Sequence, residues 1–101
     1  MRRLDVSSEA ELEVFEAALR YERERPGLGF RFEAAVNGVF LRLLENPFQF
    51  QEIEEGARRA LVRHFPYGVF FTVDDDMVTV LAVLHLHRHP DTWKGGRRGA
   101  S

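Results

Sequence analysis

The sequence contains no cysteine in its 101 residues, and this absence removes several classes of protein from consideration. Small secreted domains held together by disulfides need cysteine pairs, and thiolate metal sites need the same side chain. The sequence also lacks any stretch near the about 20 consecutive apolar residues of a membrane span, and no apolar run typical of a signal peptide follows Met1. We therefore expect a soluble cytoplasmic protein with no membrane partner.

Length and composition predict a single domain. With 101 residues, 45% of them hydrophobic, the chain can bury roughly two thirds of the surface that it exposes when unfolded, which is enough for one modest core. We place this domain at residues 1–93. Residues 94–101 are rich in glycine and arginine, a composition typical of a disordered basic tail.

Charge is distributed unevenly along the chain. The formal net charge is -2, which by itself indicates no nucleic-acid partner. Residues 1–56 contain 7 arginines and 12 acidic residues, whereas residues 57–101 contain 6 arginines, one lysine and 4 aspartates. All four histidines also lie in the second part. Any contact made through positive charge is therefore predicted to use the C-terminal half.

Two amphipathic helices are predicted in the first half. Ser8 and Glu11 form a capping-box pattern at the start of the first helix, and the Pro26-Gly27 pair ends it. The second helix is predicted to end at Asn46, because a proline disfavours helical geometry in the residue before it. The apolar positions that recur at helical spacing are Leu12, Phe15, Ala18 and Leu19 in the first helix, and Phe32, Ala35, Val36, Val39, Phe40, Leu43 and Leu44 in the second.

The apolar period changes to that of strands in the second half. Residues 49–56 are interpreted as a polar linker, and Asp74-Asp75-Asp76 as a hairpin turn. The predicted strands are Arg3–Val6, Ala57–Arg63, Tyr67–Val73 and Met77–Leu86. Because the last run is apolar on both faces, we expect it inside the sheet. The order β-α-α-β-β-β predicts an α+β fold with a helical hairpin packed on a mainly antiparallel sheet.

Four segments, taken in order, resemble successive signatures of the RelE/ParE superfamily of bacterial toxins. These signatures are a Pro-Gly turn that opens the second helix, an Asn-Pro stop, a Phe-Pro-Tyr entry to a strand, and a last strand that runs into histidine and arginine. The segments read RPGLGFRF (25–32), LLENP (43–47), RHFPYGVFFTVDDDMVTVLAVLHLHR (63–88) and HPDTW (89–93). The resemblance covers residues 3–93. It implies a toxin of a type II toxin–antitoxin module, which inhibits growth and is neutralised by a cognate antitoxin.

Two toxic activities are implied by this superfamily, and they need different residues. RelE-like toxins cleave messenger RNA on the ribosome, which requires a base, an acid and cations around the phosphate. In their pattern of basic residues, Arg59 matches one position. The next positions fall on Leu61, Gly68 and Leu86, and the tyrosine of the tail falls near Thr92 or Trp93. Most of the RelE-like set is therefore absent from the sequence.

ParE-like toxins inhibit DNA gyrase by protein contact and need no catalytic set. The segments FPYGVFFTV and LAVLHLHR are more similar to this branch, so gyrase is the preferred target. Two alternatives stay open: a ribosome-dependent endoribonuclease, and a non-toxic protein-binding module of the same fold. For a ribonuclease, the candidate catalytic residues are Arg59, Arg63, His85, His87 and Arg88. For target or antitoxin binding, the candidates are Arg59, Arg63, His85, Arg88 and Trp93.

Three histidines near the end of the predicted last strand are candidate metal ligands. His85, His87 and His89 alternate there, and imidazole is a common ligand for zinc or nickel. No acidic residue or cysteine completes the set, and Pro90 indicates that the strand has already ended. We therefore predict no metal site and no cofactor.

Overall fold

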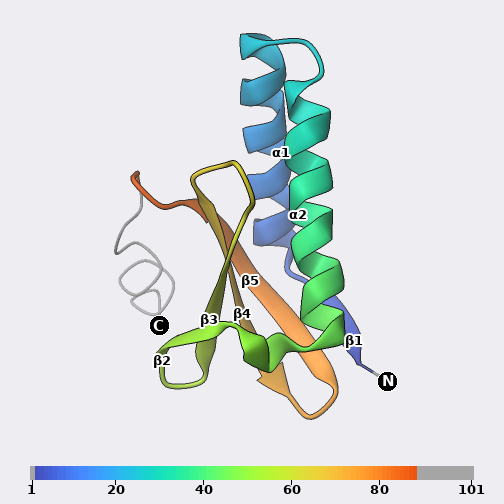
Figure 1. The fold of residues 1–101 in the computed structure, drawn as a ribbon, viewed down its shortest axis with the longest axis vertical. Coiled ribbons are helices and arrows are strands. Elements are labelled where there is room, and N and C mark those ends of the chain that lie inside the picture. The colour runs from blue at the N-terminus through green and yellow to red at the C-terminus, as the bar shows by residue number, and fades with distance from the viewer. Residues whose placement is uncertain (1, 89–101) are drawn as a thin grey trace.

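A helical hairpin lies against one face of a five-stranded sheet (Figure 1). The structure, a computed structural model, describes residues 2–88. Its elements are β1 (Arg3–Val6), α1 (Ser8–Glu24), α2 (Leu28–Glu45), a short 3-10 helix η1 (Pro47–Gln49), β2 (Gln51–Glu54), β3 (Ala57–Leu61), β4 (Tyr67–Asp74) and β5 (Met77–His85). The strand order is β1-β5-β4-β3-β2. Only the β1–β5 pair is parallel, so the predicted α+β class and the mainly antiparallel sheet are confirmed.

The core lies between the helices and the covered face of the sheet. The fully buried side chains of α2 are those expected from its helical spacing, and they meet β4 and β5. This cluster includes Phe32, Val36, Val39 and Leu43 of α2 together with Val69, Phe71, Val78 and Val80 of the sheet. A smaller cluster of Ala57, Phe70, Ala82 and Leu84 covers the other face. As predicted, β5 is therefore buried on both faces and lies inside the sheet.

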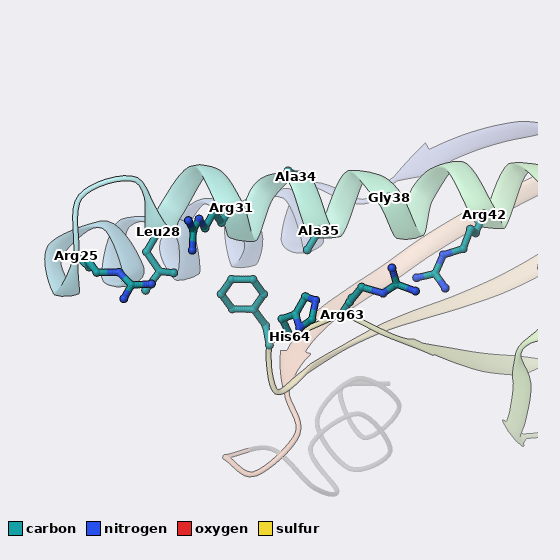
Figure 2. Close-up of a pocket in the computed structure, with 10 residues that line it drawn as sticks. Arg25, Leu28, Arg31, Ala34, Ala35, Gly38, Arg42, Arg63 and His64 are labelled. Carbon is teal, nitrogen blue, oxygen red and sulfur yellow. The ribbon is translucent and has the colours of Figure 1, made fainter.

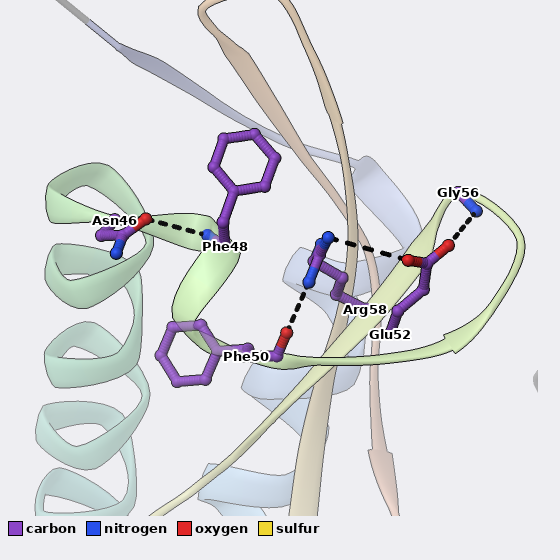
Figure 3. A network of polar contacts seen from close by, with 6 residues as sticks. All are labelled: Asn46, Phe48, Phe50, Glu52, Gly56 and Arg58. Atoms are coloured by element: carbon purple, nitrogen blue, oxygen red, sulfur yellow. Dashed lines mark hydrogen bonds and ion pairs between the residues drawn. The ribbon is translucent and has the colours of Figure 1, made fainter.

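The interpretation of residues 49–56 as a linker was wrong, because β2 lies there and forms an edge of the sheet. Arg58 of β3 holds this segment in place (Figure 3). Its guanidinium donates to the carbonyl oxygen of Phe50 at 2.7 Å and lies 3.7 Å from a carboxylate oxygen of Glu52. The other carboxylate oxygen of Glu52 accepts the N–H of Gly56 at 3.1 Å. β2 is stabilised by these contacts and by its pairing with β3. Its own sequence is mostly polar and therefore does not predict a strand.

The first helix is capped one residue earlier than predicted. Ser7, not Ser8, is the N-cap, and its hydroxyl oxygen accepts the N–H of Ala10 at 3.0 Å. Ser7 also donates its hydroxyl to the carbonyl of Leu81 and its N–H to that of Val80. Further along α1, the Glu13 carboxylate accepts the N–H of Val83 at 2.9 Å. These bonds satisfy backbone groups of β5 beyond the end of β1, where no strand is present to pair with them.

The predicted apolar face of the first helix was wrong at three of its four positions. Leu12, Phe15 and Leu19 are exposed, at 55%, 56% and 40%, and only Ala18 of that set is buried. The fully buried residues of α1 are instead small, namely Ala10, Ala17 and Ala18, and Val14 and Tyr21 pack against the core from its edge. Alanine allows α1 to approach β5 and α2 closely. Its larger apolar residues consequently form an exposed stripe, which Phe30 of α2 extends at 75% exposure.

The loop between β3 and β4 begins earlier than predicted. β3 ends at Leu61 instead of Arg63, because the chain turns there and the Val62 N–H donates to the carbonyl of Tyr67. His64 in this loop has a φ of 71°, a left-handed conformation that is uncommon for a non-glycine residue. The turn predicted at Asp74–Asp76 is confirmed, because β4 ends at Asp74 and β5 begins at Met77.

Substitution of Gly38 tests how an exposed glycine within α2 affects the stability of the protein. It lies inside the helix and is exposed, and a Cβ added there would meet no atom within 4 Å. Gly38→Ala should raise the free energy of unfolding by about 1 kcal/mol, because alanine loses less backbone entropy in a helix. Thermal denaturation measures this effect. Gly56→Ala is the control with the opposite sign, since the φ of Gly56 is 79°. A lower melting temperature for Gly38→Ala would contradict the expectation.

Candidate functional site

The end of β5 brings an imidazole, a phenol and two arginines together beside α1. His85 pairs with Tyr67 across β4 and β5, and their ring centroids are 5.2 Å apart in an edge-on arrangement. Arg20 of α1 donates a hydrogen bond to the Tyr67 hydroxyl. These residues border a cavity of about 210 Å³, which we name the β5-end cavity. Its lining consists of Glu13, Glu16, Arg20, Tyr67, Val83, Leu84, His85 and Arg88.

The imidazole of His85 fixes the turn that follows β5. The backbone N–H groups of His87 and Arg88 donate to its Nδ1 atom at 3.1 and 3.2 Å. The N–H of Leu86 donates to the carbonyl of Pro66 at 2.8 Å. The backbone of Arg88 is thus held by the half-buried His85 ring, whereas its side chain is exposed. Nδ1 accepts these bonds only in its unprotonated form.

The two arginines of this cavity also act on a neighbouring aromatic cluster. Burial raises the pKa of the Tyr21 hydroxyl above 10.0, and Tyr67 and Glu24 add to this shift, whereas Arg20 and Arg88 oppose it. Tyr21 contacts Phe32, Phe65 and Tyr67, with ring centroids 5.0 to 6.2 Å apart. The raised pKa means that the folded state favours the neutral phenol. The contribution of the neutral Tyr21 hydroxyl to the free energy of unfolding is fully present below pH 10.0. It is lost as the pH rises through the pKa that this hydroxyl has in the folded state.

A larger groove lies between α2 and the β3–β4 loop (Figure 2). Its volume is about 760 Å³, and we name it the arginine groove. The lining residues are Arg25, Leu28, Arg31, Ala34, Ala35, Gly38, Arg42, Arg63, His64 and Phe65. Among residues 2–88, no acidic side chain lines this groove. The guanidinium groups of Arg42 and Arg63 turn toward one another from the two sides of the groove.

The face of the sheet opposite the helices, which we name the open face, brings together the positions where RelE-like toxins carry basic residues. Leu61 pairs with Gly68, and a Cβ added to Gly68 would lie 3.0 Å from the Leu86 side chain. The aliphatic part of Arg59 crosses the same glycine, with Cγ 3.2 Å from that Cβ position. Three of these four neighbouring positions therefore carry leucine or glycine, and one carries a cation.

The predicted site residues divide among three places in the structure. His85, His87 and Arg88 lie together, with the two imidazole centroids 5.7 Å apart. Arg63 lines the arginine groove instead, and Arg59 lies on the open face. Trp93, His89 and the predicted tail at 94–101 are outside the described residues. Within residues 2–88, the structure contains no group of three histidine, aspartate or glutamate side chains that could hold a metal ion.

Several residues of these sites were missed from the sequence. Arg20 and Tyr67 are far apart along the chain, and nothing in their spacing indicates that they meet. The spacing of Arg31 and Arg42, in contrast, could have predicted that they lie together. They are eleven residues apart, which is close to three helical turns, so they lie on the same side of α2. Neither helix in the described part of the chain is long and apolar enough to cross a membrane.

Comparisons with known proteins agree with this fold. Residues 4–90 match the family described as "ParE toxin of type II toxin-antitoxin system, parDE". A solved structure described as "Chromosomal ParDE TA system from P. aeruginosa" superposes with a TM-score of 0.75, covering 84% of this chain and 96% of that chain. The sequence identity is 15%, so this likeness shows the fold alone. No curated protein matches the chain.

Proposed function

Because the chain belongs to the ParE toxin family of type II toxin–antitoxin systems, we propose that it arrests bacterial growth by inhibiting DNA gyrase and that a cognate antitoxin neutralises it. The observation that carries the choice of target is the composition of the open face. Cleavage of RNA through the 2′-hydroxyl builds charge on a crowded phosphate, and this charge needs positioned cations. Leu61, Gly68 and Leu86 supply none, and they lie next to one another around Arg59.

Inhibition by protein contact needs a rigid surface with charged and aromatic groups, and the β5-end cavity supports this role. It follows the strand that is buried on both faces, so its backbone is well held. Arg88, which lines this cavity, and His87, whose ring lies beside that of His85, are both exposed, so a partner protein can reach them. Arginine is common among the residues that dominate the energy of protein–protein interfaces.

A ribosome-dependent endoribonuclease is the second candidate, and the same cavity is the observation that favours it. An imidazole, a phenol and two arginines within one cavity are groups that can exchange protons and stabilise a phosphate. In this reading, His85 or His87 acts as the acid or base, and the cations come from Arg20 and Arg88.

The antitoxin is a protein partner, and the exposed apolar stripe of α1 supports such a contact. Leu12, Phe15, Leu19 and Phe30 are large apolar side chains at the surface, and contiguous patches of this kind mark interaction sites. A segment that is disordered when free can fold along a surface of this type on binding. The β2 edge of the sheet offers, in addition, backbone groups for an added strand.

The purified protein is expected to inhibit gyrase supercoiling, or to trap cleaved DNA, without cutting RNA. The gyrase assay and a ribosome assay with programmed messenger RNA are run on the same preparation. Arg59→Ala serves as the internal control, because it removes the cation of the open face. This variant should still inhibit gyrase. Codon-dependent cleavage of the messenger RNA by the wild type, lost on Arg59→Ala or on Arg88→Ala, would overturn the gyrase assignment.

A further inference from the structure

We infer that residues 89–93 fold back over the open face of the sheet and that the indole of Trp93 packs there against Phe70 and Leu84. This inference goes beyond the proposed function, because it assigns an occupant to the open face and does not depend on the toxic target. Three observations support it: the burial of an apolar cluster on this face, the path of the chain at the end of β5, and the composition of the segment.

The apolar cluster on the open face is more deeply buried than its described neighbours account for. α1 and α2 lie against the other face of the sheet (Figure 1). An antiparallel sheet with one covered face ordinarily presents solvated polar side chains on its second face. Phe70 and Leu84 are instead only 4% and 6% exposed. The partly buried residues that pack against this cluster come from the sheet and from the turn after β5, and they are Ile53, Leu81 and Leu86. Such neighbours cover the flanks of a ring that stands on a sheet, and its outer edge needs a further cover.

This further cover comes from outside residues 2–88, which leaves residue 1 and residues 89–101. The register of the sheet excludes the N-terminal side. Arg3, at the start of β1, pairs with Met77, at the start of β5, so the chain enters the sheet at the end remote from the cluster. The C-terminal side remains.

The path of the chain after β5 leads toward the cluster. A Cβ built on Gly68 would point to the open face and would lie 3.0 Å from the Leu86 side chain, so the chain has already turned over this face. Phe70 pairs with a residue three positions before the end of β5, which places it about 10 Å along the strand from that end. Five residues lead from Arg88 to Trp93, and they span at most about 18 Å when extended. Trp93 is therefore within reach of the Phe70 ring.

The composition of the segment selects Trp93 as the group that covers the cluster. It is the only large apolar side chain in residues 89–101. Burying an indole against aromatic and aliphatic groups removes a large apolar area from water. Lys94 follows it directly, and β2, at the border of the open face, carries Glu52 and Glu54. The charges of the segment and of this border are therefore opposite, which favours the same direction of docking.

A docked segment changes what the open face can bind. Arg59 pairs with Phe70 across β3 and β4, so an indole on Phe70 lies beside the one cation among the positions where RelE-like toxins carry basic residues. The segment takes the space that a phosphate would need next to this cation. The chain itself thus closes the open face.

The test uses the intrinsic fluorescence of the full chain, because Trp93 is its only tryptophan. The native protein should emit at a shorter wavelength than the protein in urea, and acrylamide should quench the native emission less. Phe70→Ala should shift the emission of the folded protein to longer wavelength and increase quenching. Phe30→Ala is the matched control, since Phe30 is an exposed phenylalanine on α2 and lies away from the open face, and this variant should emit as the wild type does.

Substitution of Trp93 itself keeps the test valid if Phe70→Ala does not fold. Trp93→Ser should lower the melting temperature by about 4 to 8 °C, and Trp93→Phe should recover most of this loss. Equal melting temperatures for the wild type and Trp93→Ser would overturn the inference. It would also be overturned by native emission at the wavelength of the unfolded chain, or by emission that Phe70→Ala leaves unchanged in a folded protein. Protected emission that is lost on dilution would overturn it in favour of a second copy of the chain. These measurements need neither gyrase nor an antitoxin, so their outcome is independent of the proposed function.

Discussion

Arg88→Ala is expected to abolish growth arrest and to shift the melting temperature by no more than about 4 °C. The side chain is exposed, so its removal leaves no cavity in the core. Its backbone N–H is held by the Nδ1 atom of His85, so the cation is presented from a fixed point at the rim of the β5-end cavity. Loss of a positioned arginine removes the charge on which either a gyrase contact or phosphate stabilisation would depend.

This expectation is checked by inducing each variant in bacteria and measuring growth together with the amount of protein made. Arg23→Ala is the matched control, since Arg23 is also an exposed arginine but belongs to α1 and does not line the cavity. A stable Arg88→Ala protein that remains fully toxic would rule out this surface. Normal growth with the wild type at verified expression would instead favour the non-toxic binding module.

His85→Ala should behave differently from Arg88→Ala. The imidazole accepts two backbone N–H groups and packs edge-on against Tyr67, so its loss removes structure as well as chemistry. We expect toxicity to fall and the free energy of unfolding to drop by about 1 kcal/mol, the usual net contribution of such hydrogen bonds. Measuring melting temperature and growth on the same variant separates the structural contribution of His85 from its direct contribution to toxicity.

Gly29→Ala is expected to lower the free energy of unfolding by about 1 to 3 kcal/mol, the usual cost of overpacking. A Cβ at Gly29 would lie 2.6 Å from the backbone oxygen of Ala18, so α1 and α2 are in close contact at this point. It would also crowd the Glu22 carboxylate, which accepts the N–H groups of Gly27 and Gly29 at 2.9 and 3.0 Å. The backbone oxygen cannot move aside, so the helical hairpin has to open.

Urea denaturation measures this loss, and Gly38→Ala is the appropriate comparison. Both substitutions add the same methyl group to the same helix, but the first meets α1 and the second meets open space. The two variants should therefore shift stability in opposite directions. An unchanged or higher midpoint for Gly29→Ala would show that the two helices are not in tight contact at this point.

Much of the fold was predictable because its signals are local. The apolar residues of α2 recur at helical spacing, and the same residues form the core. The runs of β-branched residues in β4 and β5 also predict strands directly. β2 was missed because Arg58 and the neighbouring β3 stabilise it, and neither effect is visible in its own sequence. The buried face of α1 was misplaced because close packing selects alanine, whereas periodicity is judged by the larger side chains.

The candidate sites were predictable only where their residues are close in sequence. His85, His87 and Arg88 belong to one strand end, and the structure keeps them together. Arg63 was named in the same candidate sets, but the β3–β4 loop turns at Leu61 and directs it toward α2. The arginine groove combines side chains from the α1–α2 turn, α2 and this loop. Such a combination depends on how the hairpin lies across the sheet, which no single segment encodes.

The parallel pairing of β1 with β5 affects the order in which the protein matures during translation. Arg3 pairs with Met77, so β1 leaves the ribosome well before its partner strand β5 has been made. Contacts this distant in sequence form slowly, because a long loop must close first. The helical hairpin, in contrast, is formed from consecutive segments and can assemble early. The surface at the end of β5 is therefore completed only after the helical hairpin, so the nascent chain lacks the proposed harmful surface while the hairpin is being made.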